Sequence, residues 1–156
     1  MSDLTYLPVP PADLRRIRRN GHDDFGNRLV VSTAEAGQPL RCCLTLSGEG
    51  EQIALIAYRP SPLGGPYAEV GPVFIHEAAC PGYTGHGFPS DFRERRAVLR
   101  PYDAQGQMLT GLVAEPGTSE GEVKRLLDDP TVALVHVRNL VAGCWNFSVR
   151  RTHDAE

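Results

Sequence analysis

Apolar residues in this chain occur in short runs, and prolines and glycines separate many of these runs. The 156 residues include 16 glycines and 13 prolines. A run such as 53–58 is long enough for a strand but too short for a long helix or a membrane span. Proline and glycine favour the turns between such runs. The chain is therefore expected to fold into many short strands joined by turns.

The runs predict about eight strands and two or three short helices. Strands are expected at residues 28–33, 40–47, 53–58, 70–78, 97–102, 108–114, 132–139 and 143–151. Helical spacing occurs at 12–19 and after Ser119, and a short helix is expected at 90–95. We predict an α+β fold with a mainly antiparallel sheet. The length fits a single domain over 1–156, with residues 1–27 as an N-terminal helical segment packed on it.

Charge and cysteine content narrow the classes of function. The formal net charge of −3 lacks the basic excess typical of nucleic-acid-binding proteins, and no run is long enough for a membrane. Neither nucleic acid nor membrane is therefore an expected partner. The chain starts without a basic stretch and a following apolar run, so no secretory signal is expected. Four cysteines then indicate free thiols or metal ligands, and the expected location is cytoplasmic.

The last two predicted strands carry the most informative polar residues. Alternation places His136 and Arg138 on one face of the first of them. Cys144 and Asn146 share a face of the second, opposite to Trp145. A short turn would put Arg138 beside Cys144. The same turn would put His136 beside Asn146, so a thiol, an imidazole and a guanidinium are expected on one patch.

His76 and Cys80 form a second candidate, at the end of the strand predicted over 70–78. A histidine in this position can serve as a ligand or a general base. The glycine-rich loop 81–89 follows directly and could cover a pocket. A lone histidine on an apolar face is more often a hydrogen-bonded core residue, so a structural role stays open.

We predict a small-molecule site, with an anionic small molecule as the expected partner. The expected site residues are Cys144, His136 and His76 for catalysis and Arg138, Asn146 and Cys80 for ligand binding. Arg138 would hold the anionic group, because a guanidinium pairs with carboxylate or phosphate. Cys144 would act as a nucleophile or redox thiol. The sequence identifies no cofactor and no oligomeric state, and whether the site is catalytic stays open.

A non-enzymatic interaction module is one alternative. The proline-rich segment 60–67, or an open strand edge, would then meet a protein partner or a second copy of the chain. Such a surface needs no catalytic residue, so the polar patches above would have only a structural role.

A zinc-binding domain is the other alternative. The available ligands are Cys42 or Cys43, His76, Cys80, His136 and Cys144. The chain has no Cys-x-x-Cys or His-x-x-x-His pair, so the ligands would have to meet from distant strands. Alternation on the strand predicted over 40–47 puts Cys42 and Cys43 on opposite faces, so the two are not expected to share one ion. We therefore assign no metal ligand from the sequence.

Three segments resemble a bacterial family of small proteins known as domain of unknown function 1203. The segments are Gly71-Pro72-Val73-Phe74-Ile75-His76-Glu77 with Cys80 after it, Arg100-x-Tyr102-Asp103, and Val137-Arg138 with Gly143-Cys144-Trp145-x-Phe147. The resemblance covers about 28–150. It implies a stand-alone bacterial domain of this length and no assigned activity.

Overall fold

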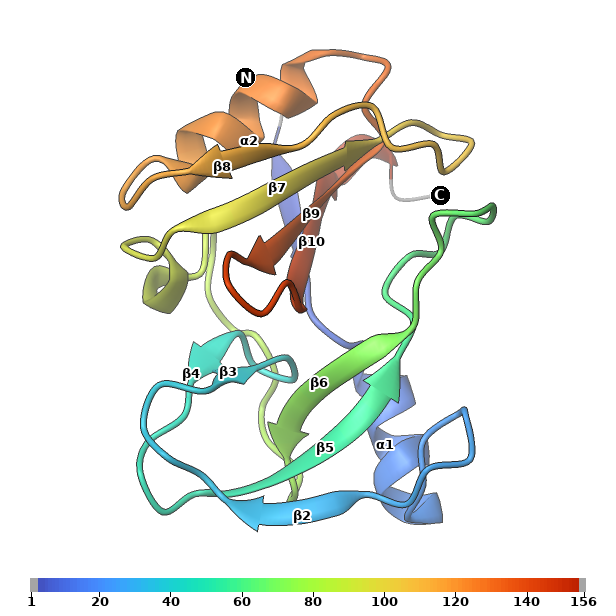
Figure 1. Cartoon of the computed structure of the whole chain (residues 1–156), viewed down its shortest axis with the longest axis vertical. Helices are drawn as coiled ribbons and strands as arrows, with labels where there is room; N and C mark the ends of the chain where they lie inside the picture. Colours follow the sequence, from blue (N-terminus) through green and yellow to red (C-terminus); the bar gives the residue numbers. More distant parts are fainter. Residues whose placement is uncertain (1–2, 155–156) are drawn as a thin grey trace.

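Ten strands divide between two five-stranded sheets in the computed structural model, which describes residues 3–154. Figure 1 shows the sheets one above the other along the long axis, with one helix packed on each. The predicted α+β class and mostly antiparallel pairing are confirmed. The strands form two sheets, however, and not the single sheet of the prediction. Within residues 3–154, the helices are too short and too polar to cross a membrane.

The first sheet combines the start of the chain with its second half. Its strand order is β1-β10-β9-β7-β8, and all pairs are antiparallel. The bounds are Leu4–Leu7 for β1, Ala97–Tyr102 for β7, Leu112–Ala114 for β8, Leu134–Asn139 for β9 and Trp145–Arg151 for β10. Helix α2 (Ser119–Asp128) covers one face through Val123, Leu126 and Leu127.

The second sheet is built from consecutive strands, in the order β2-β5-β6-β3-β4. The bounds are Val30–Thr33 for β2, Pro39–Leu40 for β3, Thr45–Leu46 for β4, Gln52–Tyr58 for β5 and Gly71–His76 for β6. Only β3 and β6 run parallel. Helix α1 (Pro11–Asn20) opens at two prolines and packs on this sheet through Leu14 and Ile17.

Four elements differ from the sequence prediction. The segment predicted as helical over 1–27 is not helical throughout its described part, 3–27, because β1 precedes α1 and joins the first sheet, while residues 1 and 2 lie outside the described residues. The strand predicted over 40–47 is two short strands around a turn, and the strand predicted over 108–114 is reduced to β8. The helix predicted over 90–95 is a single 3₁₀ turn, η1 (Ser90–Phe92), and a second 3₁₀ turn, η2 (Thr152–Asp154), follows β10.

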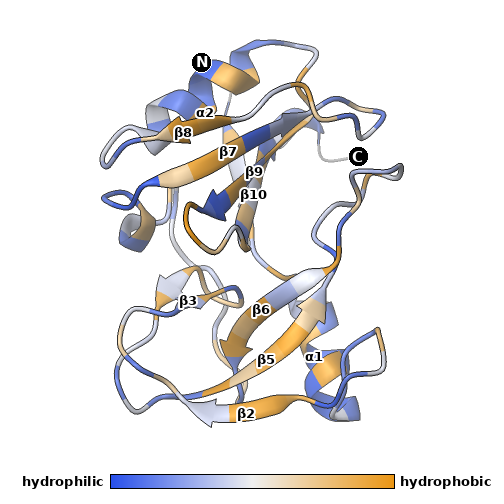
Figure 2. Cartoon of the chain, in the orientation of Figure 1, coloured by the Kyte–Doolittle hydropathy of each residue, from blue (hydrophilic) through white to orange (hydrophobic). Residues whose placement is uncertain are grey.

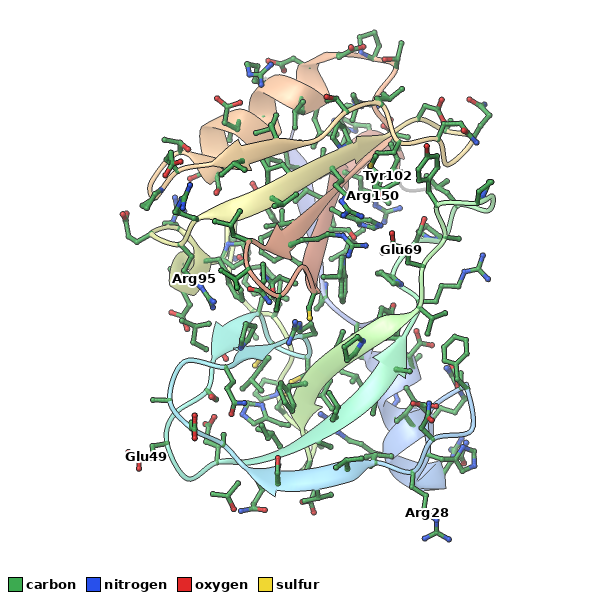
Figure 3. The ribbon with its side chains drawn as sticks, viewed as in Figure 1. Arg28, Glu49, Glu69, Arg95, Tyr102 and Arg150 are labelled. Atoms are coloured by element: carbon green, nitrogen blue, oxygen red, sulfur yellow. The ribbon has the colours of Figure 1, made fainter. Side chains whose placement is uncertain are left out.

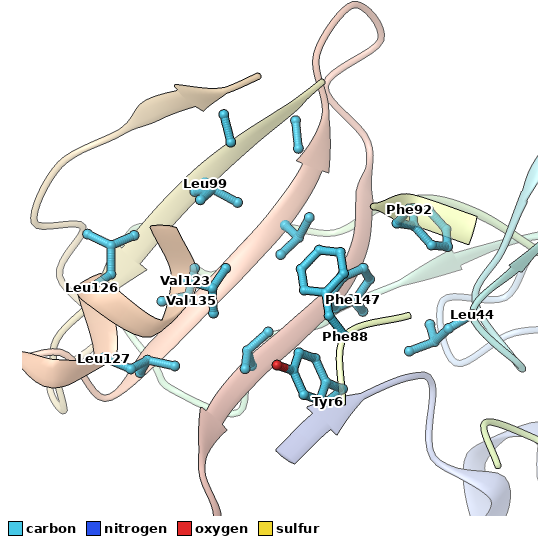
Figure 4. Close-up of a cluster of buried hydrophobic side chains, with 14 of the residues drawn as sticks. Tyr6, Leu44, Phe88, Phe92, Leu99, Val123, Leu126, Leu127, Val135 and Phe147 are labelled. Atoms are coloured by element: carbon cyan, nitrogen blue, oxygen red, sulfur yellow. The ribbon is translucent and has the colours of Figure 1, made fainter. Parts of the chain in front are cut away.

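The first hydrophobic core centres on Phe147, which is fully buried (Figure 4). Its ring lies 5.4 Å from that of Phe88 and 5.5 Å from that of Phe92, in edge-to-face contacts. Tyr6 from β1 contacts the same ring at 6.3 Å. Leu44 reaches this core from the turn between β3 and β4. Aromatic packing of this kind adds stability beyond the buried area alone.

The second core is mainly aliphatic and lies between β5, β6 and α1, and Figure 2 colours much of β5 and part of β6 hydrophobic. Trp145 belongs to this second core although it starts β10 of the first sheet. Its carbonyl accepts a 2.8 Å hydrogen bond from Nε of Arg41, a buried residue of the second sheet's turn. Trp145 and Arg41 therefore join the two sheets.

A β-bulge between Trp145 and Phe147 sets the register of the last hairpin. Trp145 pairs with Arg138, while Phe147 pairs with Val137. The extra residue reverses the alternation, so Trp145 and Phe147 enter different cores. The predicted cross-strand pairs are therefore wrong, because Arg138 pairs with Trp145 and not with Cys144, and His136 pairs with Ser148 and not with Asn146.

Candidate functional site

Cys42 and Cys43 lie in a tight turn at 41–44, between β3 and β4. The N–H of Leu44 donates to the carbonyl of Leu40 at 3.0 Å and closes the turn. Leu44 has a φ of 56°, in the left-handed region that a leucine rarely adopts. The two Sγ atoms lie 3.8 Å apart. The prediction that these thiols face opposite sides is therefore wrong, because a turn replaces the alternation of a strand.

His76, the last residue of β6, faces both thiols. Its Nδ1 lies 3.5 Å from Sγ of Cys42 and 3.7 Å from Sγ of Cys43. Its backbone N–H donates to Sγ of Cys42 at 3.2 Å. On the other side of the ring, Nε2 lies 3.4 Å from a carboxylate oxygen of Glu51. Arg18 of α1 donates to the His76 carbonyl at 3.0 Å and fixes the strand end.

Cys80 completes a cluster of four, from the loop after β6. The ligand atoms of Cys42, Cys43, His76 and Cys80 all lie within 4.8 Å of one another. A tetrahedral zinc ion with ordinary bond lengths separates two sulfur ligands by about 3.8 Å, and a sulfur from a nitrogen by about 3.5 Å. The distances of 3.8, 3.5 and 3.7 Å above match this geometry. A hollow of about 500 Å³ gives access to His76 and Cys80.

The thiols of the cluster differ in acidity. A hydrogen bond from Cys42 lowers the pKa of Cys43 to about 5, burial opposes the shift, and the Thr45 hydroxyl at 3.0 Å adds to it. Sharing that hydrogen bond with Cys43, together with burial, raises the pKa of Cys42. Burial acts to raise the pKa of Cys80, but hydrogen bonds, first that from the N–H of Gly82, bring it below its usual value. Cys43 and Cys80 thus favour thiolate, the form that binds metal ions.

A second site lies between the sheets, where Arg138 and Cys144 line a pocket of about 280 Å³. Arg138 donates to the carbonyl of Gly143 at 2.9 Å and forms an ion pair with Glu69 at 2.7 Å. The sulfur of Cys144 lies 3.9 Å from the carbonyl of Ala142. The structure thus brings together two of the predicted site residues, while His76 and Cys80 belong to the separate thiol cluster.

His136 and Asn146 are buried near this pocket but bond to other partners. Nδ1 of His136 lies 2.7 Å from the hydroxyl oxygen of Ser148, which also accepts the indole N–H of Trp145 at 2.9 Å. Asn146 donates to the side-chain oxygen of Asn139 at 3.1 Å. Among the described residues, neither side chain hydrogen-bonds to the Cys144 thiol. The expected thiol–imidazole pair is therefore not formed here.

Replacing His136 by Asn should make the folded protein less sensitive to acid. Burial first, and then the charges of Arg138 and Arg100, lower the pKa of His136 to about 3. Histidine in an unfolded chain has a pKa of about 6.5. Below that pH the unfolded chain therefore binds a proton that the folded chain does not. Stability from this group is complete above pH ~6.5 and falls towards pH ~3, by about 2 kcal/mol at pH ~5.

Urea unfolding at neutral pH and at pH ~5 measures this difference. Between neutral pH and pH ~5, His136→Asn should lose about 2 kcal/mol less stability than the wild type. His153→Asn removes an exposed histidine of η2 and serves as the matched control. An equal loss in the wild type and both variants would contradict the assignment of the acid sensitivity to His136.

The segment 60–67, proposed above as an interaction surface, covers part of the first sheet. The ring of Tyr67 lies 6.3 Å from that of Tyr102 in an edge-to-face contact. The second sheet has its own exposed apolar residues, Val30 and Val31 on β2, outside this segment. An interaction role for the segment stays a prediction.

Sequence reasoning missed three contributions to these sites. The adjacent cysteines were themselves a signal for a shared ligand pair, but the predicted strand separated them. Glu51 lies 25 residues from its partner His76, and Glu69 lies 69 residues from Arg138. Carboxylates of exposed loops and strand ends carry no spacing signal, so neither could be found from the pattern.

Comparison with known proteins places the chain in one family and finds nothing else. The family model described as "Protein of unknown function (DUF1203)" matches residues 37–151. The resemblance noted in the sequence is thereby confirmed, over a range that starts later than the expected residue 28. No curated protein and no solved structure matches the chain.

Proposed function

Since the chain belongs to the DUF1203 family, to which no function is assigned, we propose from its geometry that it binds one zinc ion through Cys42, Cys43, His76 and Cys80. The observation that carries the proposal is the spacing of the four ligand atoms, all within 4.8 Å of one another. Three sulfurs and one imidazole nitrogen in a tetrahedral arrangement are a common zinc ligand set. Soft thiolates disfavour magnesium and calcium, which prefer oxygen.

The surroundings of the four ligands support a metal centre. Metal-bound histidines usually donate their second ring N–H to a carboxylate or a carbonyl. Glu51 holds that position for His76, 3.4 Å from Nε2. The backbone N–H of His76 and the hydroxyl of Thr45 lie 3.2 and 3.0 Å from the sulfurs of Cys42 and Cys43. Such contacts orient thiolates and spread their negative charge.

Four protein ligands leave no open coordination position, so the proposed role of the ion is structural. The ion would tie the turn 41–44 to the end of β6 and to the loop that starts at Cys80. Both attached segments run into the first core, through Leu44 and Phe88. The metal would therefore hold together the segments that connect the two sheets.

The purified protein should contain one zinc ion per chain, as measured by elemental analysis under reducing conditions. Cys80→Ser and His76→Gln should lose most of the metal, because each removes one of four ligands. Cys144→Ser is the matched control, because it removes the one cysteine outside the cluster. Cobalt substitution adds a spectroscopic test, since thiolate-to-metal charge transfer reports the bound sulfurs.

Two outcomes would overturn the zinc proposal. One is a wild-type protein that takes up neither zinc nor cobalt after reduction and reconstitution. The other is equal metal loss in Cys144→Ser and Cys80→Ser, which would show that the metal is bound elsewhere.

The free thiols support a location in a reducing compartment, and we propose the cytoplasm. All four cysteines are unpaired in the structure. Thiolate clusters bind metal only while they remain reduced, and disulfides form readily outside the cell.

A further inference from the structure

One face of the first sheet is polar and positively charged although it is largely buried. Arg100 on β7 and Ser148 on β10 both pair with His136 on β9. Paired residues share a face, and so do residues two apart on a strand. Arg138 and Arg150 therefore lie on the same face as His136. Three arginines and an imidazole line this face, which looks towards the second sheet.

A single carboxylate lies between two of these arginines. Glu69, in the loop between β5 and β6, is 3.2 Å from the guanidinium of Arg100 and 2.7 Å from that of Arg138. Among the described residues, Arg150 forms no ion pair. Figure 3 shows Glu69 and Arg150 in the same region beside the sheets. The three arginines carry three positive charges, and Glu69 carries one negative charge. His136 adds no charge, because its lowered pKa leaves it neutral at physiological pH.

Several buried donors on this face have no partner. Nε of Arg138, Nε of Arg150 and the hydroxyl of Tyr102 make no hydrogen bond with the described residues. Arg138 is 7% exposed and Tyr102 is 2% exposed. Buried donors without partners are rare in native proteins, because their desolvation is not offset. Such donors at a positively charged face are the expected mark of an anion site.

The pocket beside Arg138 has room for a small organic molecule. Its volume of about 280 Å³ is close to the lower limit of about 300 Å³ for ligand pockets. Tyr58 and Trp145 form an aromatic wall, with ring centroids 5.4 Å apart. A guanidinium and two aromatic rings in the same lining suit a molecule with an anionic group and an apolar body.

The loop that carries Glu69 is anchored at its centre. Gly106, in the turn after β7, has a φ of +81°, and a Cβ there would collide with the carbonyl of Gly64. This close backbone contact docks the loop on the first sheet. The Glu69 side chain, by contrast, is 47% exposed. The carboxylate can therefore move away from the arginines while the loop keeps its place.

We propose that this pocket binds a small molecule through a carboxylate group, which replaces the Glu69 carboxylate on Arg100 and Arg138. Glu69 then acts as an internal competitor that neutralises the arginines when no ligand is present. The unpartnered donor of Arg138 adds a further contact to the incoming carboxylate. The metal centre has no part in this inference, so each can fail without the other.

Glu69→Gln should tighten the binding of benzoate, a simple aromatic carboxylate, by about tenfold, because it removes the competitor from an occupied site. Isothermal titration calorimetry measures the affinity, and the fluorescence of Trp145, the only tryptophan, reports binding at the pocket. Glu49→Gln is the matched control, because Glu49 is an exposed carboxylate on the opposite side of the molecule from Glu69 in Figure 3. Adding Arg100→Gln to Glu69→Gln should abolish the gain.

Arg100 is chosen because its side chain is 31% exposed, so the variant retains the buried Arg138. Inorganic phosphate is titrated in parallel to separate the two anion classes. Tighter benzoate binding in Glu69→Gln alone, lost with Arg100→Gln, supports the proposal. Equal affinities in Glu69→Gln and Glu49→Gln, no saturable benzoate binding in any variant, or binding of phosphate alone would overturn it.

Discussion

Removal of the proposed zinc ion should lower the midpoint of thermal unfolding by about 8–16 °C. A ligand that binds only the folded state raises the free energy of unfolding by about 4 kcal/mol when its free concentration is about a thousand times its Kd. For a chain of this size, the midpoint of thermal unfolding falls by about 2–4 °C for each kcal/mol of stability that is lost. The ion would join the turn 41–44 to β6 and the Cys80 loop, and these segments separate on unfolding. Calorimetric scans of the reduced protein, with and without a zinc chelator, measure the shift.

The chelator experiment separates a metal effect from a loss of thiol packing. Cys144→Ser should unfold like the wild type and respond equally to the chelator, because Cys144 lies outside the cluster. Cys80→Ser should unfold at a lower temperature and show no further response. A wild-type midpoint that does not move with the chelator, or with added zinc, would contradict a structural ion.

Phe147→Ala should reduce the free energy of unfolding by about 3–5 kcal/mol. Phe147 is fully buried and contacts the rings of Tyr6, Phe88 and Phe92. Alanine removes these ring contacts and leaves a cavity that the neighbouring side chains of the sheet cannot fill. Urea unfolding measures the change. We expect a lower urea concentration at the midpoint and an unchanged slope of the free energy of unfolding with urea concentration.

Val141→Ala provides the comparison for this prediction. Val141 is 98% exposed in the turn between β9 and β10, so its loss should leave stability within about 0.5 kcal/mol of the wild type. A loss below about 1 kcal/mol in Phe147→Ala would mean that the first core does not depend on this ring.

The sequence predicted most strands because their apolar runs are separated by strong turn formers. β5, β7 and β9 lie within two residues of their predicted bounds. β1 was missed because four residues near the start of the chain carry no clear period. The turn 41–44 was missed because it contains neither proline nor glycine, and Leu44 closes it in a conformation that leucine rarely adopts.

The two sites were only partly visible in the sequence. His76 and Cys80 were identified from their place at a strand end, but their partners were assigned to opposite faces of a strand that does not exist. Arg138 was predicted to bind an anion, and its predicted pairing with Cys144 depended on a regular hairpin. A bulge adds one residue without a change in composition, so alternation alone cannot reveal it. Glu69 reaches its arginines only through tertiary folding.

The position of β1 also has a consequence for the order in which the chain can fold. β1 pairs with β10, and the hydroxyls of Thr5 and Thr152, 147 residues apart, lie 2.9 Å from each other. During synthesis, β1 leaves the ribosome first but has no partner until the last strand follows. All five strands of the second sheet, and all four ligands of the thiol cluster, lie within residues 30–80. That half can form early, whereas β1 can pair with β10 only after β10 has been made, and pairings between such distant segments form slowly.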